Sequence, residues 1–337
     1  MKKIVCFIFS IICSLSMFAC DFIHGNEQKE QGEDKEITVY TPDGAPALSL
    51  AKLLHEDTES DGVTYNVVPA TGIEAYVTYE DESKNADVCI LPLTDASLHL
   101  SSGEQYQLLG IVTHGNFFLM SETETTYGAN NLTDLIGKKI GVVQLGKLPG
   151  LVLRSIFKRE GIHYKVKSNL TDCEAGVVNL INIAPTAIKK NLGYDLFSMP
   201  EPLATVREKN GFFRVGSMQT LYGGENGYPQ AALVAKRSLI ENKKAWVDGF
   251  IRNVTVNEDW LKAADMETVL TAINSHLQEG VTPSFSTANL SAQAIAGCNV
   301  RFQSASEAKT EVNGLITSLM NVQPEAVKSL ADGFFYQ

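Results

Sequence analysis

Residues 37–55 read ITVYTPDGAPALSLAKLLH and predict a strand, a turn-rich loop and a helix in succession. The run Ile37–Tyr40 is rich in β-branched residues, which favour a strand, and apolar residues recur at a helical spacing from about residue 47 to 55. The loop Thr41–Pro46 between them carries two prolines and a glycine, which end regular structure. A strand that leads through a loop into a helix is the repeating unit of an α/β protein.

The same unit recurs downstream, which predicts a sheet of parallel strands. The carboxyl ends of parallel strands lie at one edge of such a sheet, and open α/β sheets bind ligands at that edge. The predicted elements are a strand at residues 64–68 with a helix at 73–79, a buried strand at 86–91 with a short helix after the loop 92–95, and an apolar strand at 107–114.

A polar stretch at residues 121–131 separates this first set of elements from a second, and we interpret it as a crossing between two lobes. The chain returns near residues 222–229 and enters a strand at 231–235. Beyond residue 237 the pattern is almost wholly helical, with one buried stripe formed by Trp246, Phe250, Val254, Trp260 and Leu261. Between the crossings we expect helices at 131–136, 151–161 and 186–192, strands at 139–143, 164–166 and 195–199, and a glycine-rich loop at 144–150.

The first twenty residues, 1–20, indicate an export signal. Two lysines precede an apolar run at residues 4–18 that is too short to span a bilayer as a permanent helix. The run ends at Ala19 and Cys20, which resemble the lipid-attachment motif of bacterial lipoproteins, so we expect a lipidated Cys20. In the alternative reading, the leader is a plain secretory signal and Cys20 is incidental. Residues 21–36 are typical of a polar tether, so we expect an exported protein anchored to a membrane.

The composition excludes several classes of protein. The chain of 337 residues carries a formal net charge of −11 and is long enough for two hydrophobic cores. It has no cluster of Lys and Arg, so we expect no nucleic-acid partner. It also lacks the nucleophile-elbow, zinc-protease and phosphate-loop motifs, so we expect a non-enzyme without a metal or a cofactor. Cys89, Cys173 and Cys298 match no metal or redox spacing and are interpreted as structural thiols, with one disulfide as the alternative.

The order of five short motifs resembles that of periplasmic solute-binding proteins of ABC-type importers. The branch that it resembles most is the nitrate/sulfonate/taurine and thiamine-pyrimidine-precursor group, and the resemblance extends over residues 36–337. The motifs are TPDGAPA at residues 41–47, ADVCILP at 86–92, GKKIGV at 137–142, EP at 201–202 and GYPQ at 227–230.

The resemblance implies an α/β, two-lobed periplasmic binding protein fold of type 2, in which each lobe is a mostly parallel sheet flanked by helices. Two crossing segments join the lobes, and a small-molecule ligand binds in the cleft as the lobes close. On this sequence the first lobe comprises residues 37–122 and 231–337, and the second comprises residues 123–230. Such a protein works as a monomer with an ABC permease and an ATPase.

Loops at the predicted strand ends supply the candidate ligand contacts, because free backbone N–H groups at helix starts can hold a polar ligand group. Glu201, Tyr228 and Gln230 come from the EP and GYPQ motifs, and Asn182 of the second lobe completes the candidates. The full set is Thr41, Asp43, Gly44, Thr71, Gly72, Thr94, His114, Asn116, Gln144, Gly146, Asn182, Glu201, Tyr228 and Gln230.

Several of these residues also have a structural interpretation. Asp43 is equally suited to forming a turn or capping a helix, and His114 to a hydrogen-bonded structural role. Glu201 either binds the ligand or braces the hinge, and Tyr228 either stacks on a flat ligand or packs in the hinge. Lys147, the strong cation of these loops, either faces the cleft or points to solvent.

The charge of these loops favours a neutral or cationic ligand. They contain no arginine, which a sulfonate, nitrate or phosphate site commonly uses, whereas Asp43, Asp95 and Glu201 are acidic. We therefore expect a nitrogen-containing molecule, aromatic ones included. Backbone amides can bind anions unaided, so a receptor for sulfonate, nitrate or taurine is the first alternative. The others are a sensory lipoprotein without a transporter and, less favoured, an enzyme resembling pyrimidine synthases, whose Cys-rich motif is missing here.

Overall fold

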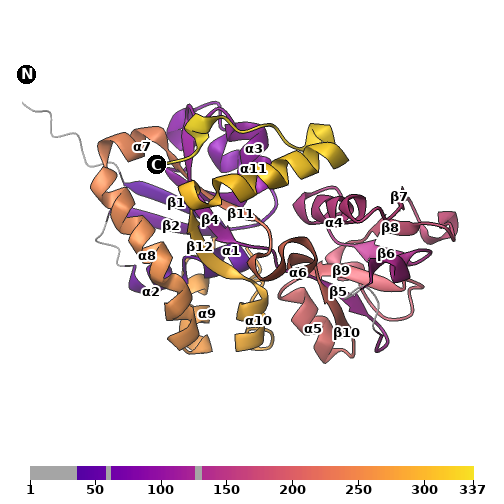
Figure 1. Ribbon diagram of the computed structural model, residues 1–337. Coiled ribbons are helices and arrows are strands. Elements are labelled where there is room, and N and C mark those ends of the chain that lie inside the picture. Colours follow the sequence, from indigo (N-terminus) through magenta and orange to yellow (C-terminus); the bar gives the residue numbers. More distant parts are fainter. Residues whose placement is uncertain (1–35, 58–61, 126–130) are drawn as a thin grey trace, which may run out of the picture. The chain divides into compact units, whose positions relative to one another are not determined.

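The computed structural model describes residues 36–57, 62–125 and 131–337. Residues 36–337 form one compact unit, and its described part contains two β-sheets of six strands each, flanked by helices (Figure 1). The predicted signal sequence, Cys20 and the tether up to residue 35 lie outside the described residues. Within the part that the structure describes, no helix combines the length and the apolar composition that a membrane span requires.

The first sheet combines strands from both ends of the chain. β1 pairs in parallel with β2 and β3, whereas β11 lies antiparallel between β3 and β4, and β12 is antiparallel to β4. The strands β1 to β4 therefore run in one direction. Along the sheet the order is β12 (Val300–Ser304), β4 (Tyr106–Thr113), β11 (Ala231–Lys236), β3 (Val88–Pro92), β1 (Ile37–Pro42) and β2 (Val63–Val68).

The second sheet is made by the middle of the chain. β6 is parallel to β8 and β9, and β7 is parallel to β8, whereas β5 lies antiparallel between β9 and β10. The order is β10 (Phe213–Ser217), β5 (Phe117–Ser121), β9 (Leu196–Pro200), β6 (Lys139–Val142), β8 (Val178–Asn182) and β7 (Tyr164–Lys167). Both sheets are mostly parallel in strand direction, which confirms the predicted two-lobed α/β fold.

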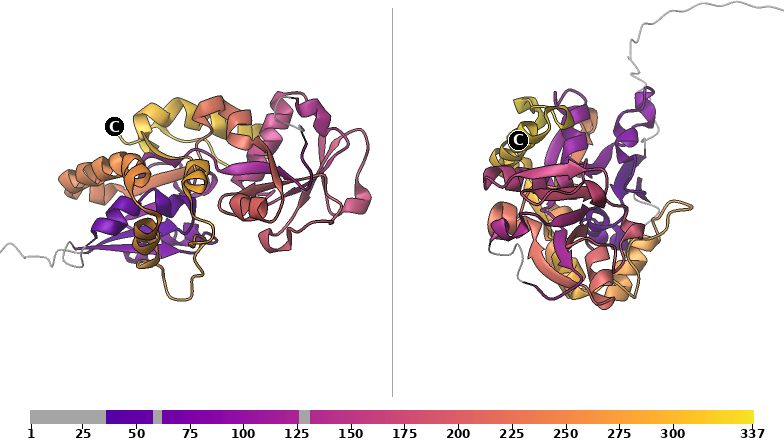
Figure 2. Two further views of the ribbon diagram at one scale, coloured as in Figure 1. Left: turned by 90° about the horizontal axis from the view of Figure 1, so that it is seen from below. Right: turned by 90° about the vertical axis from the view of Figure 1, so that its right-hand side faces the viewer.

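The helices cover both faces of the sheets, and α11 runs from the first lobe toward α4 of the second (Figures 1 and 2). The α-helices are α1 (Ala45–Leu48), α2 (Ala51–Glu56), α3 (Leu93–Leu100), α4 (Leu148–Arg159), α5 (Leu203–Lys209), α6 (Met218–Gly223), α7 (Arg237–Asn242), α8 (Lys244–Ala263), α9 (Met266–Asn274), α10 (Ala292–Gly297) and α11 (Ala305–Val322). The 3₁₀ turns are η1 (Ile73–Val77), η2 (Glu82–Lys84), η3 (Leu132–Leu135), η4 (Leu170–Asp172), η5 (Pro185–Ala187), η6 (Gly224–Asn226), η7 (Pro324–Ala326) and η8 (Asp332–Phe334).

Strand β3 shows how the sequence builds two buried layers from one strand. Val88 and Ile90 belong to the core that includes α2, α8 and α9, whereas Cys89 and Leu91 belong to the core that includes α3 and α11. Successive side chains point to opposite faces of a sheet, so a strand covered on both faces is apolar at every position. This explains why residues 88–91 of the predicted strand are apolar at every position.

The helix predicted at residues 47–55 is broken into α1 and α2. Asn257 of α8 is buried at the break, where its Nδ2 donates to Leu48 O at 2.9 Å and its Oδ1 accepts from Lys52 N at 2.9 Å. The side chain of a distant helix therefore replaces the backbone partners that a continuous helix would have supplied. No local pattern in residues 47–55 predicts this break.

The first crossing lies earlier than the predicted stretch at 121–131. β5 pairs with β9 of the second sheet, from Phe117 against Pro200 to Met120 against Phe197, so the chain changes lobe at residues 114–116. The predicted lobe boundary at residue 122 is corrected accordingly. The return crossing lies beside the first one, because Gln230 N donates to Thr113 O at 2.9 Å.

Other elements differ from the prediction in the middle and at the end of the chain. The helix expected at 186–192 is only the short turn η5, and β12 interrupts the C-terminal part that was predicted to be almost wholly helical. The stripe on α8 is buried at Phe250, Val254 and Leu261, but its two tryptophans are only half-buried. Cys89, Cys173 and Cys298 are free thiols.

Candidate functional site

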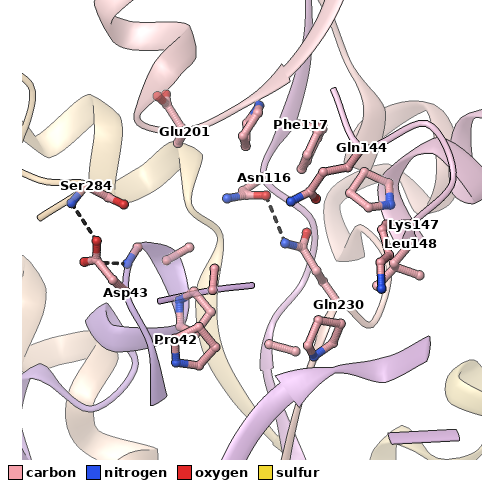
Figure 3. Close-up of a pocket in the computed structure, with 18 of the residues that line it drawn as sticks. Pro42, Asp43, Asn116, Phe117, Gln144, Lys147, Leu148, Glu201, Gln230 and Ser284 are labelled. Atoms are coloured by element: carbon pink, nitrogen blue, oxygen red, sulfur yellow. Dashed lines mark hydrogen bonds between the residues drawn. The ribbon is translucent and has the colours of Figure 1, made fainter. Parts of the chain in front are cut away.

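A cavity of about 450 Å³ lies where loops of both lobes meet (Figure 3). The first lobe contributes residues after β1, β2 and β3, and the second contributes residues after β6 and β9. The two crossing segments supply Asn116, Phe117 and Gln230. This volume lies within the range of small-molecule sites.

The cavity brings together most of the predicted residues. Most of them follow the carboxyl ends of parallel strands, as predicted, whereas Gln230 precedes the antiparallel strand β11. Those that line the cavity are Asp43, Gly44, Thr71, Gly72, Thr94, Asn116, Gln144, Glu201 and Gln230. The remaining predicted residues, Thr41, His114, Gly146, Asn182 and Tyr228, do not line it.

His114 and Tyr228 belong to the interior of the crossing region. Both side chains are fully buried, and Tyr228 N donates to His114 O at 3.2 Å. The ring of Tyr228 packs so closely on Gly115 that a Cβ at that glycine, whose φ is +89°, would lie 2.5 Å from it. Tyr228 therefore packs between the crossings, the second of its two predicted roles.

Burial also fixes the protonation of His114. Its Nε2 lies 3.1 Å from Gln303 Oε1, while burial and the charge of Arg301 lower the pKa of the ring to about 3. A buried imidazole without a carboxylate partner stays neutral, because the charged form loses its hydration. His114 is thus a structural group that holds the first crossing.

Asn182 and Gly146 act on the loop that follows β6 and do not reach the cavity. Asn182 accepts a hydrogen bond from Leu145 N at 3.2 Å through Oδ1, and Gly146 is exposed. The same loop holds Gln144 at a φ of 58°, which is uncommon for a residue with a side chain. Asn182 thereby positions Gln144, which does line the cavity. Thr41 is fully buried, and its Oγ1 donates a hydrogen bond to Pro42 O at 3.4 Å.

Asp43 joins two loops of the first lobe. Its Oδ1 accepts from Gly44 N at 2.9 Å and its Oδ2 accepts from Ser284 N at 2.6 Å (Figure 3). The carboxylate therefore holds the segment that contributes Ser284 and Asn289 to the cavity. The sequence did not predict these two residues, because they lie in a long loop between α9 and α10 that carries no strand-end pattern.

Glu201 is committed to a buried network. Its Oε1 accepts from Arg214 Nη2 at 2.6 Å and from Thr205 Oγ1 at 3.2 Å, and its Oε2 accepts from Thr205 N at 3.1 Å. The guanidinium of Arg214 also lies over the ring of Phe118, 4.2 Å from its centroid. Glu201 is fully buried by these partners, which supports the bracing role among the two that the sequence left open.

Two residues that line the cavity carry a buried side-chain oxygen without a hydrogen-bond partner among the described residues. Gln230 Nε2 donates to Asn116 Oδ1 at 3.0 Å, which leaves the buried Gln230 Oε1 unpartnered (Figure 3). Thr94 Oγ1 is also buried and unpartnered, and the residue is only 3% exposed. Buried polar groups in proteins are nearly always satisfied, so these two atoms favour a polar ligand that completes their bonds.

One pair of opposite charges spans the cavity between the lobes. Lys147 Nζ, at the start of α4, is 3.9 Å from Asp95 Oδ1 in the first turn of α3. Burial raises the pKa of Asp95, with Lys147 opposing the shift and Glu74 adding to it. Among the described residues that line the cavity there is no arginine, and Lys147 is the one lysine. In the same part of the chain, no group of three or more His, Cys, Asp or Glu side chains could hold a metal ion.

Much of the remaining wall is apolar and rigid. Phe117 and Leu148 line it together with prolines that stand at the ends of strands and the starts of helices. Proline at those positions fixes the backbone and presents a flat ring. These prolines could have been predicted as lining residues, because the strand-end loops of the sequence are rich in proline. The prolines that line the cavity are Pro42, Pro46, Pro92, Pro149, Pro185, Pro200 and Pro202.

No protein-family model matches the sequence, and no curated protein matches it either. Solved structures do match. An ABC transporter protein from Parabacteroides distasonis has a TM-score of 0.67 at 18% identity, over 90% of this chain and 99% of that one. The periplasmic aliphatic sulphonate binding protein SsuA from Escherichia coli has a TM-score of 0.59 at 14% identity, over 85% and 93% of the two chains. The alkanesulfonate-binding protein SsuA from Xanthomonas axonopodis pv. citri, bound to MOPS, has a TM-score of 0.56 at 14% identity, over 87% and 96%.

These likenesses extend over most of each chain and include both lobes. This chain itself has two six-stranded sheets and two adjacent crossings between them. The chain therefore has the two-lobed type 2 periplasmic binding protein fold.

Proposed function

We propose that the protein is an extracytoplasmic solute-binding lipoprotein of an ABC-type importer. It is a non-catalytic, monomeric receptor that takes a small organic molecule into the cavity between its lobes. The observation that carries this proposal is the cavity itself, which both lobes line and which holds the buried, unpartnered Thr94 Oγ1 and Gln230 Oε1. The likeness in fold to solved binding proteins of importers supports it.

The favoured ligand is neutral or cationic and contains nitrogen. Asp95 and Glu74 line the cavity, and no arginine does so among its described residues. The prolines and Phe117 offer flat apolar faces, which suit an aromatic or heterocyclic body. Gln230 Oε1 accepts hydrogen bonds only, so it requires a donor such as an N–H group.

Closure of the lobes is a hinge motion at residues 113–117 and 228–231, where the crossings lie side by side. The ligand favours the closed form by its greater affinity for that form. The acyl chains on Cys20 keep the receptor at the outer face of the membrane, close to a permease and its ATPase. Genes for such partners next to this one would distinguish an importer from a sensory lipoprotein.

An anion receptor is the second candidate. Two of the similar structures are sulfonate-binding proteins, and the start of α4 brings backbone donors and Lys147 to the cavity. The absence of arginine from the described lining weighs against this candidate, because bidentate guanidinium contacts are the usual means of holding a sulfonate or phosphate.

A thermal-shift screen of residues 36–337 tests the proposal. The panel contains vitamins, vitamin precursors, amines and sulfonates, and a ligand at 100 times its Kd adds about 2.7 kcal/mol to the free energy of unfolding. We expect a neutral or basic heterocycle to raise Tm and to be recovered unchanged. A clear shift with taurine or an alkanesulfonate would favour the anion receptor, and conversion of the ligand would contradict a non-catalytic role.

A further inference from the structure

The pair Asp95–Lys147 joins the two lobes across the cavity, but its two side chains differ in exposure. The side chain of Asp95 is 10% exposed, whereas that of Lys147 is 63% exposed. Their distance of 3.9 Å is longer than a hydrogen bond, so the contact is a charge pair only. Because Lys147 is exposed to water and makes no hydrogen bond to Asp95, we expect the pair to contribute no more than a surface pair, at most about 1 kcal/mol. Lys147 therefore neutralises Asp95 incompletely.

Asp95 shares the cavity with a second acidic side chain and with two residues that carry an unpartnered side-chain oxygen. Glu74 lies near enough to raise the pKa of Asp95, and both residues line the cavity. The neighbouring Thr94 is 3% exposed and its Oγ1 has no partner among the described residues. Gln230 Oε1, a further cavity atom, is buried and lacks a donor as well. A group that offers several N–H donors and a positive charge satisfies this arrangement best.

We propose that the ligand carries a protonated nitrogen that binds at Glu74, Thr94 and Asp95 and displaces Lys147, which competes with it for Asp95. This inference rests on the proposed function and names the ligand class of the same cavity. The neutral body of the ligand then lies against Phe117 and the prolines. Lys147, freed from Asp95, turns to solvent, where most of its side chain already is.

Removal of the charge of Lys147 should change the binding affinity, and the direction of that change differs between ligand classes. Removing the ammonium of Lys147 removes a competitor for a cationic ligand, so binding tightens. The same change removes an attractive charge for an anionic ligand, so binding weakens. For a neutral ligand that makes no use of the charges, the change has little effect.

The test uses a panel of ring compounds, each present in aminomethyl, hydroxymethyl and sulfonatomethyl forms, with benzene, pyridine, pyrimidine and imidazole as the rings. Dissociation constants are measured by calorimetry for wild type and Lys147→Met, which keeps the apolar stem. We expect aminomethyl forms to bind wild type, and Lys147→Met to bind them about threefold tighter, the size of a removed surface charge pair. Lys189→Met, an exposed lysine of the same lobe outside the cavity, is the control and should leave binding unchanged.

Asp95→Asn and Glu74→Gln test the two acidic side chains that would bind the protonated nitrogen. Each should weaken binding of aminomethyl forms about tenfold more than binding of hydroxymethyl forms, as expected for loss of a charge-assisted hydrogen bond. Glu74 is only half-buried, so we expect Glu74→Gln to fold even if Asp95→Asn does not.

The possible outcomes distinguish failure of this inference from failure of the proposed function. Preferred binding of sulfonatomethyl forms, weakened by Lys147→Met, would overturn the inference and leave the receptor function standing. Hydroxymethyl forms that bind as well as aminomethyl forms would overturn it in the same way. A panel without any binder in any charge class would contradict the proposed function, and the inference would fall with it.

Discussion

Gln230 donates through Nε2 to Oδ1 of Asn116 at 3.0 Å, and this bond joins the two chain crossings where both line the cavity. Backbone bonds between Gln230 N and Thr113 O and between Tyr228 N and His114 O continue the same contact. The elements that would bend during closure and the elements that would touch the ligand are therefore the same. Ligand contact at Gln230 is a direct means of favouring one hinge geometry over another.

Gln230→Leu should impair binding more than it impairs folding. The change removes the donor to Asn116 and the free acceptor Oε1, so we expect Kd to rise about tenfold and the free energy of unfolding to fall by about 1 kcal/mol. Gln105→Leu is the matched control, because the side chain of Gln105 makes an exposed hydrogen bond to Glu82 in the same lobe. Unchanged affinity in Gln230→Leu, measured by titration calorimetry, would remove Gln230 from the site.

Two glycines in helices should respond to alanine with opposite signs. A Cβ on Gly297 of α10 would lie 2.7 Å from Glu201 Oε1, an atom that Arg214 and Thr205 hold in place. We expect Gly297→Ala to lower the free energy of unfolding by about 1 to 3 kcal/mol. A Cβ on Gly314 of α11 meets no atom within 4 Å, so Gly314→Ala should raise that free energy by about 0.5 to 1 kcal/mol.

Chemical denaturation measures both changes in the free energy of unfolding. Because Gly297 belongs to the first lobe and Glu201 to the second, the contrast also tests how closely the lobes approach there. Equal stabilisation by the two alanines would mean that Glu201 does not contact α10.

Glu201→Gln should act on stability and not primarily on affinity. It leaves Arg214 without its buried carboxylate, which costs about 3 kcal/mol when one partner of a buried pair is removed. Glu208→Gln is the matched change at the more exposed carboxylate on the same arginine, 2.8 Å from its Nε, and should cost less than about 1 kcal/mol. A variant Glu201→Gln that folds with wild-type stability but loses ligand would restore the ligand-binding role of Glu201.

His114 should make stability depend on pH. Its pKa is about 3 in the folded protein and about 6.5 in an unfolded chain, so the unfolded state binds more protons between these values. The contribution of neutral His114 is complete above pH 6.5 and is lost as pH falls from 6.5 toward 3, at up to about 1.4 kcal/mol per pH unit.

His114→Gln should therefore lose this slope between pH 6.5 and 5, as measured by denaturation at several pH values. His99→Gln, at an exposed histidine of α3, serves as the control and should keep the slope. Identical slopes in wild type and His114→Gln would show that His114 is not buried as a neutral ring.

The sequence was sufficient for the features that depend on local pattern. The apolar runs of β1, β3 and β6 and the turn residues after them predicted that Asp43, Thr94 and Gln144 lie at the carboxyl ends of parallel strands, where the cavity lies. These features follow from side-chain period and turn chemistry, both of which act over a few residues.

Features that depend on distant partners were not predictable in this way. Only His114, Gly115 and Asn116 separate the apolar runs of β4 and β5, so the crossing between lobes carries almost no local signal. The role of Glu201 depends on Arg214, which reaches it from another strand, and the break before α2 depends on Asn257. Such pairings are set by tertiary packing, which overrides local preference.

A bulky side chain inside the cavity would show whether the ligand binds between the lobes. Ala70 is exposed and lines the cavity, so Ala70→Trp places an indole where the ligand would lie without disturbing the core. Ala175→Trp makes the same change at an exposed position outside the cavity. With the strongest binder from the thermal-shift screen, calorimetry should give a Kd at least about 100-fold higher for Ala70→Trp and unchanged for Ala175→Trp. A wild-type Kd in Ala70→Trp would show that the ligand does not bind between the lobes.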